Sequence, residues 1–424
     1  MSTNRFDLLI LGNGLAGCAA AVFAAREGLA TAVVGATDGE LLFASGLLDV
    51  LGVFPPEEGR QWPNPELGWQ RLVRHHPNHP YALSDFQKAV EAVESLTDFL
   101  SKAGLPYAGF SRRNCRVVTP AGTVKTTFRV PQTMWPGVQS MERKQPALLV
   151  DFRGFKEYSS HHMAGRLCSR WPTVRAARIE FPGTLQRSEL YGQHLAHSLE
   201  VPAVREALAA AVLPLCEGVE AVGFPAVLGV HDSPAVCRDL SERLGRPVFE
   251  TPTLPPSVPG LRLKETFSSA LESCGVQMIP HHRAQNVSAI EDGYEVVVQG
   301  QEGAQTLRAR GVVLATGRFV GGGLRAERKR IRETLLDLPV IAPSSRAHWH
   351  RSEMLDLRGH PINRSGVAVD AACRPLSEAG RPWGTHVYAV GSLLAYQDWM
   401  RTKSGAGMAI TTAAHAVKHF AHTG

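Results

Sequence analysis

The sequence lacks the cysteine spacings from which iron–sulfur clusters and structural zinc sites are built. Its seven cysteines are scattered singly, their number is odd, and no two of them form a C-x-x-C pair. This pattern is typical of a reducing cytoplasm, in which thiols act as small buried apolar groups. It excludes the usual cluster and zinc-finger classes, so any redox centre in the chain is expected to be organic.

No stretch of the sequence is typical of a membrane span or a secretory signal. The one long uncharged stretch, Leu8–Ala25, is interrupted by three glycines and preceded by Asp7 instead of a basic region. We interpret it as a buried strand and helix. At 424 residues, with 44% hydrophobic and 20% charged residues, the chain is predicted to be a soluble globular protein with room for two domains.

Basic stripes interleaved with aromatic residues, which nucleic-acid binders show, are also missing. The net charge of +6 and pI near 9.0 favour an anionic small-molecule substrate, an acidic protein partner or an anionic membrane surface. Charged residues spread evenly over a solvated surface, with no ligand or partner, explain the same net charge. The residues Arg325–Arg332 form a basic patch, which either is a solvated surface or contacts a phosphate or a partner protein.

A strand, a glycine-rich turn and a helix open the chain. Leu8–Leu11 is an unbroken apolar run, typical of a strand buried on both faces of a parallel sheet. Gly12, Gly14 and Gly17 follow at once and match G-x-G-x-x-G, and the alanine-rich segment 16–26 is a strong helix former. A helix N-terminus holds phosphate with backbone donors alone, so this stretch predicts a nucleotide site.

The second strand of this unit, Ala30–Val34, lacks the acidic residue that usually follows it. Dinucleotide sites carry Asp or Glu there to hold a ribose hydroxyl. Gly35 and Ala36 occupy the position, although Asp38 or Glu40 has the reach to substitute. The absence weakens the case for an adenosine half of a cofactor.

Two further small-residue strand ends lie near the C-terminus. The segment 311–317 is a buried strand that ends in Ala-Thr-Gly, and 386–392 is an apolar strand that stops at Gly-Ser. The segment 403–407 then opens a terminal helix over 408–420 with two glycines. Like the first turn, these turns offer backbone N–H groups and no bulky side chains. Together they predict one cofactor site built from both ends of the chain.

The middle of the chain predicts a second α/β domain. Prolines interrupt the sequence from residue 55. The cluster His75–His79 consists of histidines beside a proline, and no carboxylate motif accompanies it, so we expect no metal site there. Alternating strand and helix patterns follow. We expect a hairpin over 114–128, strands over 147–152 and 219–230, and helices over 86–100, 202–212, 234–244 and 267–274. The predicted domains are 1–55 with 275–424 for the nucleotide site, and 56–274 for the insertion.

The segment Thr251–Gly260 is too rich in proline for a helix or a central strand. It precedes Arg262 and Lys264, two cations that a rigid loop would present to an anionic substrate. A stiff crossover between domains is an equally good interpretation. The loop from Glu40 to Asp49 carries Ser45 and Gly46, and it either follows the cofactor or forms an ordinary buried turn.

Four long stretches resemble the B subunit of the anaerobic glycerol-3-phosphate dehydrogenase. They are RFDLLILGNGLAG at 5–17, LLFASGLLDVL at 41–51, PTLPPSVPGLRL at 252–263 and GGGLRAERKRIRE at 321–333. The resemblance implies a Rossmann-type α/β flavoprotein, cytoplasmic and peripheral at the inner face of the cell membrane through its partner subunits. It implies FMN, with FAD as the alternative, a larger FAD-bearing A subunit and a membrane-associated iron–sulfur C subunit.

The implied reaction oxidises sn-glycerol 3-phosphate to dihydroxyacetone phosphate and passes electrons to quinone, in support of fumarate or nitrate respiration. An independent FAD oxidoreductase and a non-catalytic assembly subunit are the alternatives. We assign no catalytic residue and no metal. The residues expected to line the flavin are Gly12, Gly14, Leu15, Gly17, Ser45, Gly46, Gly317, Gly391, Ser392, Gly405 and Gly407.

Overall fold

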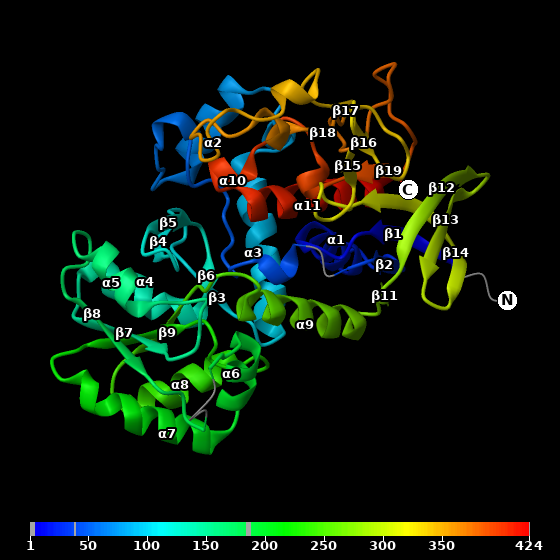
Figure 1. Ribbon diagram of the computed structural model, residues 1–424. Helices are drawn as coiled ribbons and strands as arrows, with labels where there is room; N and C mark the ends of the chain where they lie inside the picture. The colour runs from blue at the N-terminus through cyan, green and yellow to red at the C-terminus, as the bar shows by residue number, and fades with distance from the viewer. Residues whose placement is uncertain (1–4, 38–39, 184–187, 424) are drawn as a thin grey trace. The chain divides into compact units, whose positions relative to one another are not determined.

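The computed structural model describes residues 5–37, 40–183 and 188–423, which form two compact units (Figure 1). Unit 1 comprises Met1–Glu40, Asp49–Phe99 and Phe267–Gly424, and unit 2 comprises Leu41–Leu48 and Leu100–Thr266. Each unit contains a sheet and helices, so the predicted α/β class is confirmed. These units differ from the expected ranges in three places: residues 56–99 and 267–274 group with unit 1, and residues 41–48 group with unit 2.

The main sheet of unit 1 joins strands from both ends of the chain. Its order is β11-β2-β1-β14-β13-β12, and β19 pairs with β14. β2, β11 and β19 run parallel to β1 and to the second half of β14, whereas β12 and β13 form an antiparallel meander. The strands are β1 (Arg5–Leu11), β2 (Thr31–Gly35), β11 (Gln277–Pro280), β12 (Arg283–Ile290), β13 (Gly293–Gly300), β14 (Gly303–Leu314) and β19 (Val387–Ala389).

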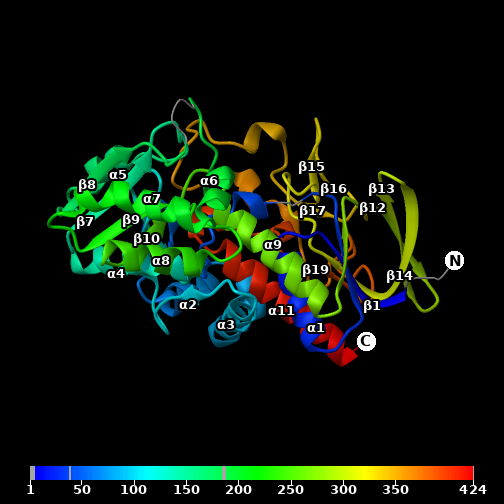
Figure 2. The ribbon, with the colours of Figure 1, turned by 90° about the horizontal axis from the view of Figure 1, so that it is seen from below.

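Helices α1 and α11, from opposite ends of the chain, lie side by side in both ribbon views (Figures 1 and 2). The buried residues of α1 are mostly alanine and glycine, and those of α11 include one glycine and three alanines, which allow the two helix axes to approach closely. The helices of unit 1 are α1 (Leu15–Arg26), α2 (Pro65–His75), α3 (Phe86–Lys102, which continues past the unit's limit), α10 (Trp399–Thr402) and α11 (Gly405–Thr423).

The segment expected to be an irregular loop contains helix α2. Asn64 caps this helix by accepting a hydrogen bond from the N–H of Glu66 (2.9 Å), and Pro65 occupies its first position. A proline at that position loses no helical hydrogen bond, since the first turn has no internal acceptor for its N–H. The expectation that the prolines after residue 55 interrupt regular structure was wrong here, because a proline in the first turn of a helix does not break it.

Short two-stranded pairs and 3-10 turns complete unit 1. The basic patch lies on the β15–β16 hairpin, where Glu327 pairs with Arg330 (3.6 Å) and Arg332 (3.3 Å) and thereby neutralises part of its charge. The short elements are β15 (Leu324–Ala326), β16 (Ile331–Glu333), β17 (Val340–Ile341), β18 (Gly366–Val367), η2 (Pro56–Glu58), η3 (Pro80–Leu83), η6 (Arg346–His348), η7 (Pro361–Arg364) and η8 (Gly391–Leu393).

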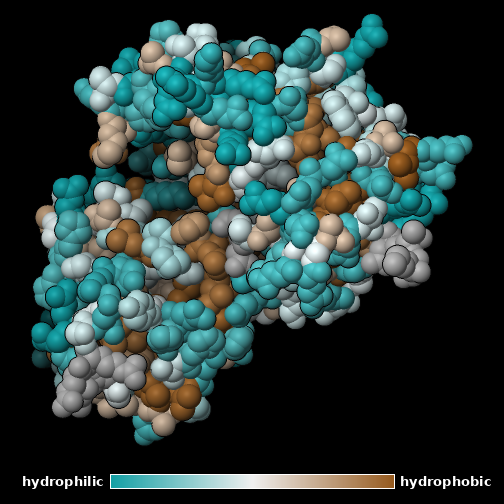
Figure 3. Space-filling view, turned by 45° about the vertical axis from the view of Figure 1, so that its right-hand side comes forward, coloured by the Kyte–Doolittle hydropathy of each residue, from teal (hydrophilic) through white to brown (hydrophobic). Residues whose placement is uncertain are grey.

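Hydrophilic residues cover most of the face seen in Figure 3, with smaller hydrophobic areas between them. Within the described parts of the chain, no helix combines the length and the apolar character that crossing a membrane requires.

Unit 2 is built on a parallel sheet of order β10-β9-β7-β8, preceded by the predicted hairpin β4–β5. Its elements are η1 (Leu41–Phe43), β3 (Tyr107–Ala108), β4 (Cys115–Val118), β5 (Val124–Thr127), β6 (Val130–Pro131), η4 (Gln132–Met134), α4 (Trp135–Arg143), β7 (Ala147–Phe152), α5 (Ser160–Leu167), β8 (Val174–Ile179), α6 (Gly192–Leu199), α7 (Pro202–Val212), η5 (Leu213–Cys216), β9 (Ala221–Pro225), α8 (Ser233–Leu244) and β10 (Val248–Thr251).

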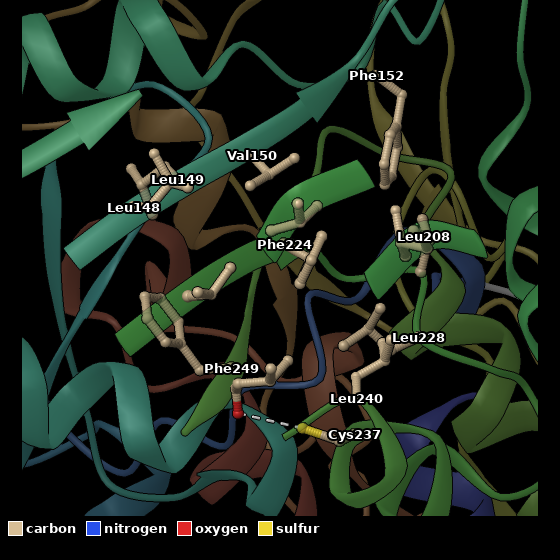
Figure 4. Close-up of a cluster of buried hydrophobic side chains, with 14 of the residues drawn as sticks. Leu148, Leu149, Val150, Phe152, Leu208, Phe224, Leu228, Cys237, Leu240 and Phe249 are labelled. Carbon is tan, nitrogen blue, oxygen red and sulfur yellow. Dashed lines mark hydrogen bonds between the residues drawn. The ribbon is translucent and has the colours of Figure 1, made fainter. Parts of the chain in front are cut away.

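The core of unit 2 covers both faces of this sheet, since its buried side chains come from the strands, from helices α7 and α8, and from helices α4 and α5 (Figure 4). Phe152, Phe224 and Phe249 come from three of its strands, and Leu208 and Leu240 come from the two helices. Five of the seven cysteines are buried, as expected for thiols that act as apolar groups, whereas Cys168 and Cys274 are exposed. No disulfide joins the seven cysteines, which the described residues include in full.

Helix α9 (Val258–Ser273) begins inside the segment judged too rich in proline for a helix. Pro259 is its second residue, where a missing N–H costs nothing. Arg262 therefore lies on a buried helical turn and not on a loop. Its guanidinium binds both oxygens of Glu250 (2.7 and 2.8 Å) and the carbonyl of Gly229 (2.8 Å), so it is not available to an anionic substrate.

The Arg262–Glu250 pair predicts a stability effect in unit 2. Arg262→Met leaves the Glu250 carboxylate buried without its cation, so the free energy of unfolding is expected to fall by about 3–5 kcal/mol in urea titrations followed by circular dichroism. Arg238→Met, at an exposed arginine of α8, is the control and is expected to change it by less than about 0.5 kcal/mol. Equal losses in the two variants would contradict the assignment.

Candidate functional site

The carboxyl ends of β1, β14 and β19 meet at one edge of the unit 1 sheet. Leu11 pairs with Leu314, and Leu314 pairs with Ala389, in parallel register. Ligands of open parallel sheets bind outside such strand ends. We call the turns that follow the three strands the glycine cradle, which consists of residues 12–15, 315–317 and 391–392.

Gly12 and Gly17 hold the first turn against its neighbours. Gly12 has φ +120°, a conformation that favours glycine, and a Cβ built on it would lie 2.2 Å from the carbonyl oxygen of Ala315. A Cβ built on Gly17 would lie 1.7 Å from the carbonyl oxygen of Gly12. Both glycines are therefore required by packing within the protein.

Gly14 differs from these two glycines because its open side faces no protein atom. A Cβ built there meets nothing within 4 Å. Gly14 is the N-cap of α1, and the first helical hydrogen bond runs from the N–H of Cys18 to its carbonyl (2.9 Å). The N–H groups of Leu15, Ala16 and Gly17 thus belong to the free helix end, which carries about half a positive charge.

The second and third turns close the cradle. Gly317 (φ +69°) lies near Ser392, since a Cβ built on Gly317 would be 3.6 Å from the Ser392 hydroxyl oxygen. Gly391 (φ +71°) approaches α1 so closely that its Cβ would lie 2.6 Å from the Cβ of Ala16. The structure therefore brings together Gly12, Gly14, Leu15, Gly17, Gly317, Gly391 and Ser392.

One buried polar atom of the cradle lacks a partner. The hydroxyl oxygen of Thr316 is buried and makes no hydrogen bond in the structure. An unsatisfied hydroxyl costs about 1–3 kcal/mol, so such groups often mark a ligand position. The free helix end, the open face of Gly14 and this hydroxyl fit a phosphate-bearing cofactor such as a flavin.

At the end of β2, the side chain of Asn13 fills the place of the missing acid. A Cβ built on Gly35 would lie 2.3 Å from the Asn13 side-chain carbon Cγ, so the glycine makes room for the amide. Asp38 lies outside the described residues. Burial raises the pKa of Glu40, against the lowering effect of the nearby Arg318.

Arg318 was missed by the sequence reasoning. It is 7% exposed and donates to the carbonyls of Ser392 (2.6 Å), Gln397 (2.8 Å) and Asn363. Burial lowers its pKa to about 10, although Asp398 and Glu40 oppose this change. The side chain stays charged at neutral pH and ties the Ala-Thr-Gly turn to the Gly391–Ser392 turn. Its position directly after Ala-Thr-Gly was the sequence feature that could have identified it as a residue of the site.

Gly405 and Gly407 open α11, but both pack against protein. A Cβ on Gly405 would lie 2.9 Å from the ring of Trp399, and one on Gly407 would lie 2.6 Å from the Tyr81 hydroxyl. The N–H of Gly407 donates to the carbonyl of Asp49 (2.6 Å). That amide is already satisfied, so close packing explains the glycine at 407, and the expected donation to a ligand does not hold.

Ser45 and Gly46 belong to unit 2. Gly46 has φ +79°, and a Cβ built on it would lie 3.0 Å from both Pro131 and Pro259. Close packing within unit 2 accounts for this glycine. The role of the two residues beside a cofactor stays a prediction.

The absence of a metal site also stays a prediction. Among the residues that the structure describes, His197, Glu200 and His231 of unit 2 have potential ligand atoms within 4.8 Å of one another. One oxygen of Glu200 already accepts the N–H groups of Val230 (2.9 Å) and His231 (2.7 Å). These bonds explain the position of Glu200 without a metal.

Comparisons with known proteins show the family of the chain. The family described as "FAD binding domain" matches residues 7–408. The B subunit of the anaerobic glycerol-3-phosphate dehydrogenase of Pectobacterium atrosepticum is 29% identical over 427 residues, or 99% of each chain. The probable B subunit of the anaerobic glycerol-3-phosphate dehydrogenase of Halobacterium salinarum is 32% identical over 421 residues, covering 96% of this chain and 95% of that protein.

A solved 3-ketosteroid Δ1-dehydrogenase from Sterolibacterium denitrificans covers 100% of both chains with a TM-score of 0.47 and 13% identity. Values this low say nothing about the substrate of this chain.

The open face of Gly14 predicts a selective loss of cofactor. Gly14→Val places a side chain where the phosphate would lie, without meeting protein atoms within 4 Å at its Cβ. Flavin retained after purification is expected to fall to about a tenth or less, because a loss of ~1.4 kcal/mol in binding already lowers affinity tenfold. The ratio of flavin absorbance to protein absorbance measures the retained flavin. Gly165→Val, at an exposed helical glycine, is the control.

Gly17→Ala provides the contrast within the same turn. Its new methyl would overlap the carbonyl of Gly12, so the variant is expected to lose about 3 kcal/mol of stability and its flavin together. Gly14→Val is expected to keep its thermal midpoint within a few degrees. A Gly14→Val protein with undiminished flavin would refute the cradle as the cofactor site.

Proposed function

The chain belongs to the FAD binding domain family and to the family of anaerobic glycerol-3-phosphate dehydrogenase B subunits, and from this we propose that it is the flavin-carrying subunit of a respiratory dehydrogenase. In this proposal the complex oxidises sn-glycerol 3-phosphate to dihydroxyacetone phosphate. Electrons pass through an iron–sulfur C subunit to quinone, and a larger FAD-bearing A subunit completes the assembly.

The glycine cradle is the observation that carries the proposal. A flavin phosphate needs backbone donors and the absence of side chains, and the end of α1 at Gly14 offers both. The relatives cover 99% and 96% of the chain. When bound, a flavin supplies the two-electron acceptor that oxidation of a secondary alcohol requires.

The residues of this chain would act on such a cofactor by binding and orientation. The N–H groups at the start of α1 hold its phosphate, and Gly317 and Gly391 keep the edges of the cradle free of side chains. The buried charge of Arg318, behind Ser392, favours anionic groups in the cradle. No catalytic residue is assigned, because no acid or base is among the cradle residues.

The cofactor is proposed to be FMN, with FAD as the alternative. Asn13 and Gly35 occupy the end of β2 at which a carboxylate would hold an adenosine ribose, which favours FMN. The description of the family names FAD.

Acid release followed by chromatography identifies the cofactor. One flavin per chain that elutes with FMN is the expected result, because Asn13 and Gly35 occupy the end of β2 at which a carboxylate would hold an adenosine ribose. A product that elutes with FAD would overturn the FMN assignment and leave the flavin site intact.

Purification with and without the candidate partners tests the function. The chain together with an A subunit is expected to reduce a dye with glycerol 3-phosphate, whereas the chain alone is expected to carry flavin without this activity. Dye reduction by the chain alone would support an independent oxidoreductase. A colourless chain that still copurifies with an A subunit would support an assembly role.

We also propose that the protein is cytoplasmic and reaches the membrane only through its partners. The net charge of +6 suits acidic partner surfaces. Fractionation of cells with and without the C subunit measures the share of the chain in the membrane fraction. The chain is expected to leave that fraction when the C subunit is missing.

A further inference from the structure

Unit 1 contains a pocket of about 410 Å³ that lies outside the glycine cradle. It is lined by the segments His75–His79 and 341–343, by Pro361 and Arg364–Ser365, and by Tyr396. We call it the histidine pocket. Its size suits a small ligand.

His79 lines this pocket, and its ring carries a buried donor that has no acceptor. It is 2% exposed, and its Nδ1 accepts the N–H of Tyr81 (3.1 Å), so the proton of the neutral ring is on Nε2. Burial, with the nearby charges of His76 and Arg364, lowers the pKa of His79 to about 3. The ring is therefore neutral at physiological pH, and its buried Nε2–H has no partner in the structure.

Ser365 provides a second unsatisfied group. It is 1% exposed, and its hydroxyl oxygen is buried without a hydrogen bond. Arg364, its neighbour, is exposed and positively charged. Two orphan polar groups in one pocket each cost about 1–3 kcal/mol unless a ligand pairs with them.

The electrostatics of the pocket favour an anion over a metal ion. No carboxylate is among its lining residues. The Arg364 charge already lowers the pKa of both His76 and His79, and it would repel a cation in the same way. The Nδ1 of His75 is bound to the carbonyl of Arg71 (2.8 Å), which leaves one nitrogen of that ring.

Arg318 connects this pocket to the glycine cradle. Its guanidinium binds the carbonyls of Ser392, in the cradle, and of Asn363 and Gln397, which directly adjoin Arg364 and Tyr396 in the chain. The N–H of Tyr396 in turn donates to the carbonyl of Arg364 (3.0 Å). The two sites thus share one hydrogen-bonded frame.

We propose that the histidine pocket binds the phosphate group of a small phosphate monoester. Arg364 supplies the charge, and His79 Nε2–H and Ser365 Oγ–H donate to the phosphate oxygens. Identification of that ester as the oxidised substrate rests on the proposed function, whereas the phosphate assignment does not.

Isothermal titration of the flavin-loaded protein tests the site with three probes: glycerol 3-phosphate, inorganic phosphate and glycerol. Glycerol 3-phosphate is expected to bind, inorganic phosphate to compete with it, and glycerol to give no signal. Arg364→Gln is expected to weaken the binding of both anions about tenfold or more, because it removes a charged hydrogen-bond donor. Ser365→Ala is expected to weaken it about fivefold.

Arg381→Gln, at an exposed arginine of unit 1 outside the pocket, is the matched control and is expected to leave both affinities unchanged. Flavin content and thermal midpoint are measured for every variant, so a folding defect is distinguished from a lost contact. Equal affinity in Arg364→Gln and the control would overturn the proposal.

Three other results test the parts of this proposal, and the second of them separates it from the function proposed above. Binding of inorganic phosphate without the ester would overturn the assignment to a monoester. Arg364-dependent binding of glycerol 3-phosphate, with no dye reduction in the assembled complex, would uphold the pocket and refute the dehydrogenase. Zn²⁺ that displaces phosphate from the pocket would show a cation site and overturn the anion assignment.

Discussion

The parallel pairing of β1 with β14 is the constraint on which the cradle depends. It joins two strands about 300 residues apart in the chain and sets the backbone of Gly12 directly against Ala315. A side chain at 12 would force the two strand ends apart, since its Cβ would lie 2.2 Å from a carbonyl oxygen. The helix end at Gly14 keeps its position only while this contact holds.

The two sites proposed in unit 1 would recognise negative charge in two different ways. The glycine cradle offers backbone N–H groups at a helix end and leaves one face open. The histidine pocket offers side chains, namely a cation and two buried groups that lack partners. Arg318 is buried and donates to the carbonyl of Ser392 in the cradle and to those of Asn363 and Gln397, which adjoin pocket residues in the chain. A long phosphorylated cofactor and a small phosphorylated substrate need such separate means of recognition.

Local sequence patterns predicted most of the regular structure because the forces that decide it are local. The strand–turn–helix of residues 8–26, the hairpin over 114–128 and the terminal helix depend on apolar periodicity and glycine position. The errors arose where a proline's position mattered more than its presence. Helices α2 and α9 both begin with a proline in the first turn, where its missing N–H costs nothing.

By itself the sequence determined the α/β class, the glycine-rich turn at the start of a helix and the small residues at three strand ends, because each depends on neighbours within a few residues. Only the tertiary structure decided which groups are free to bind a ligand. Arg262 is bound to Glu250, and the N–H of Gly407 donates to the carbonyl of Asp49, so neither is available to a ligand. The Nε2–H of His79, in contrast, has no partner in the structure. A hydrogen bond between residues far apart in the chain leaves no local pattern, so its presence or absence follows only from the folded arrangement.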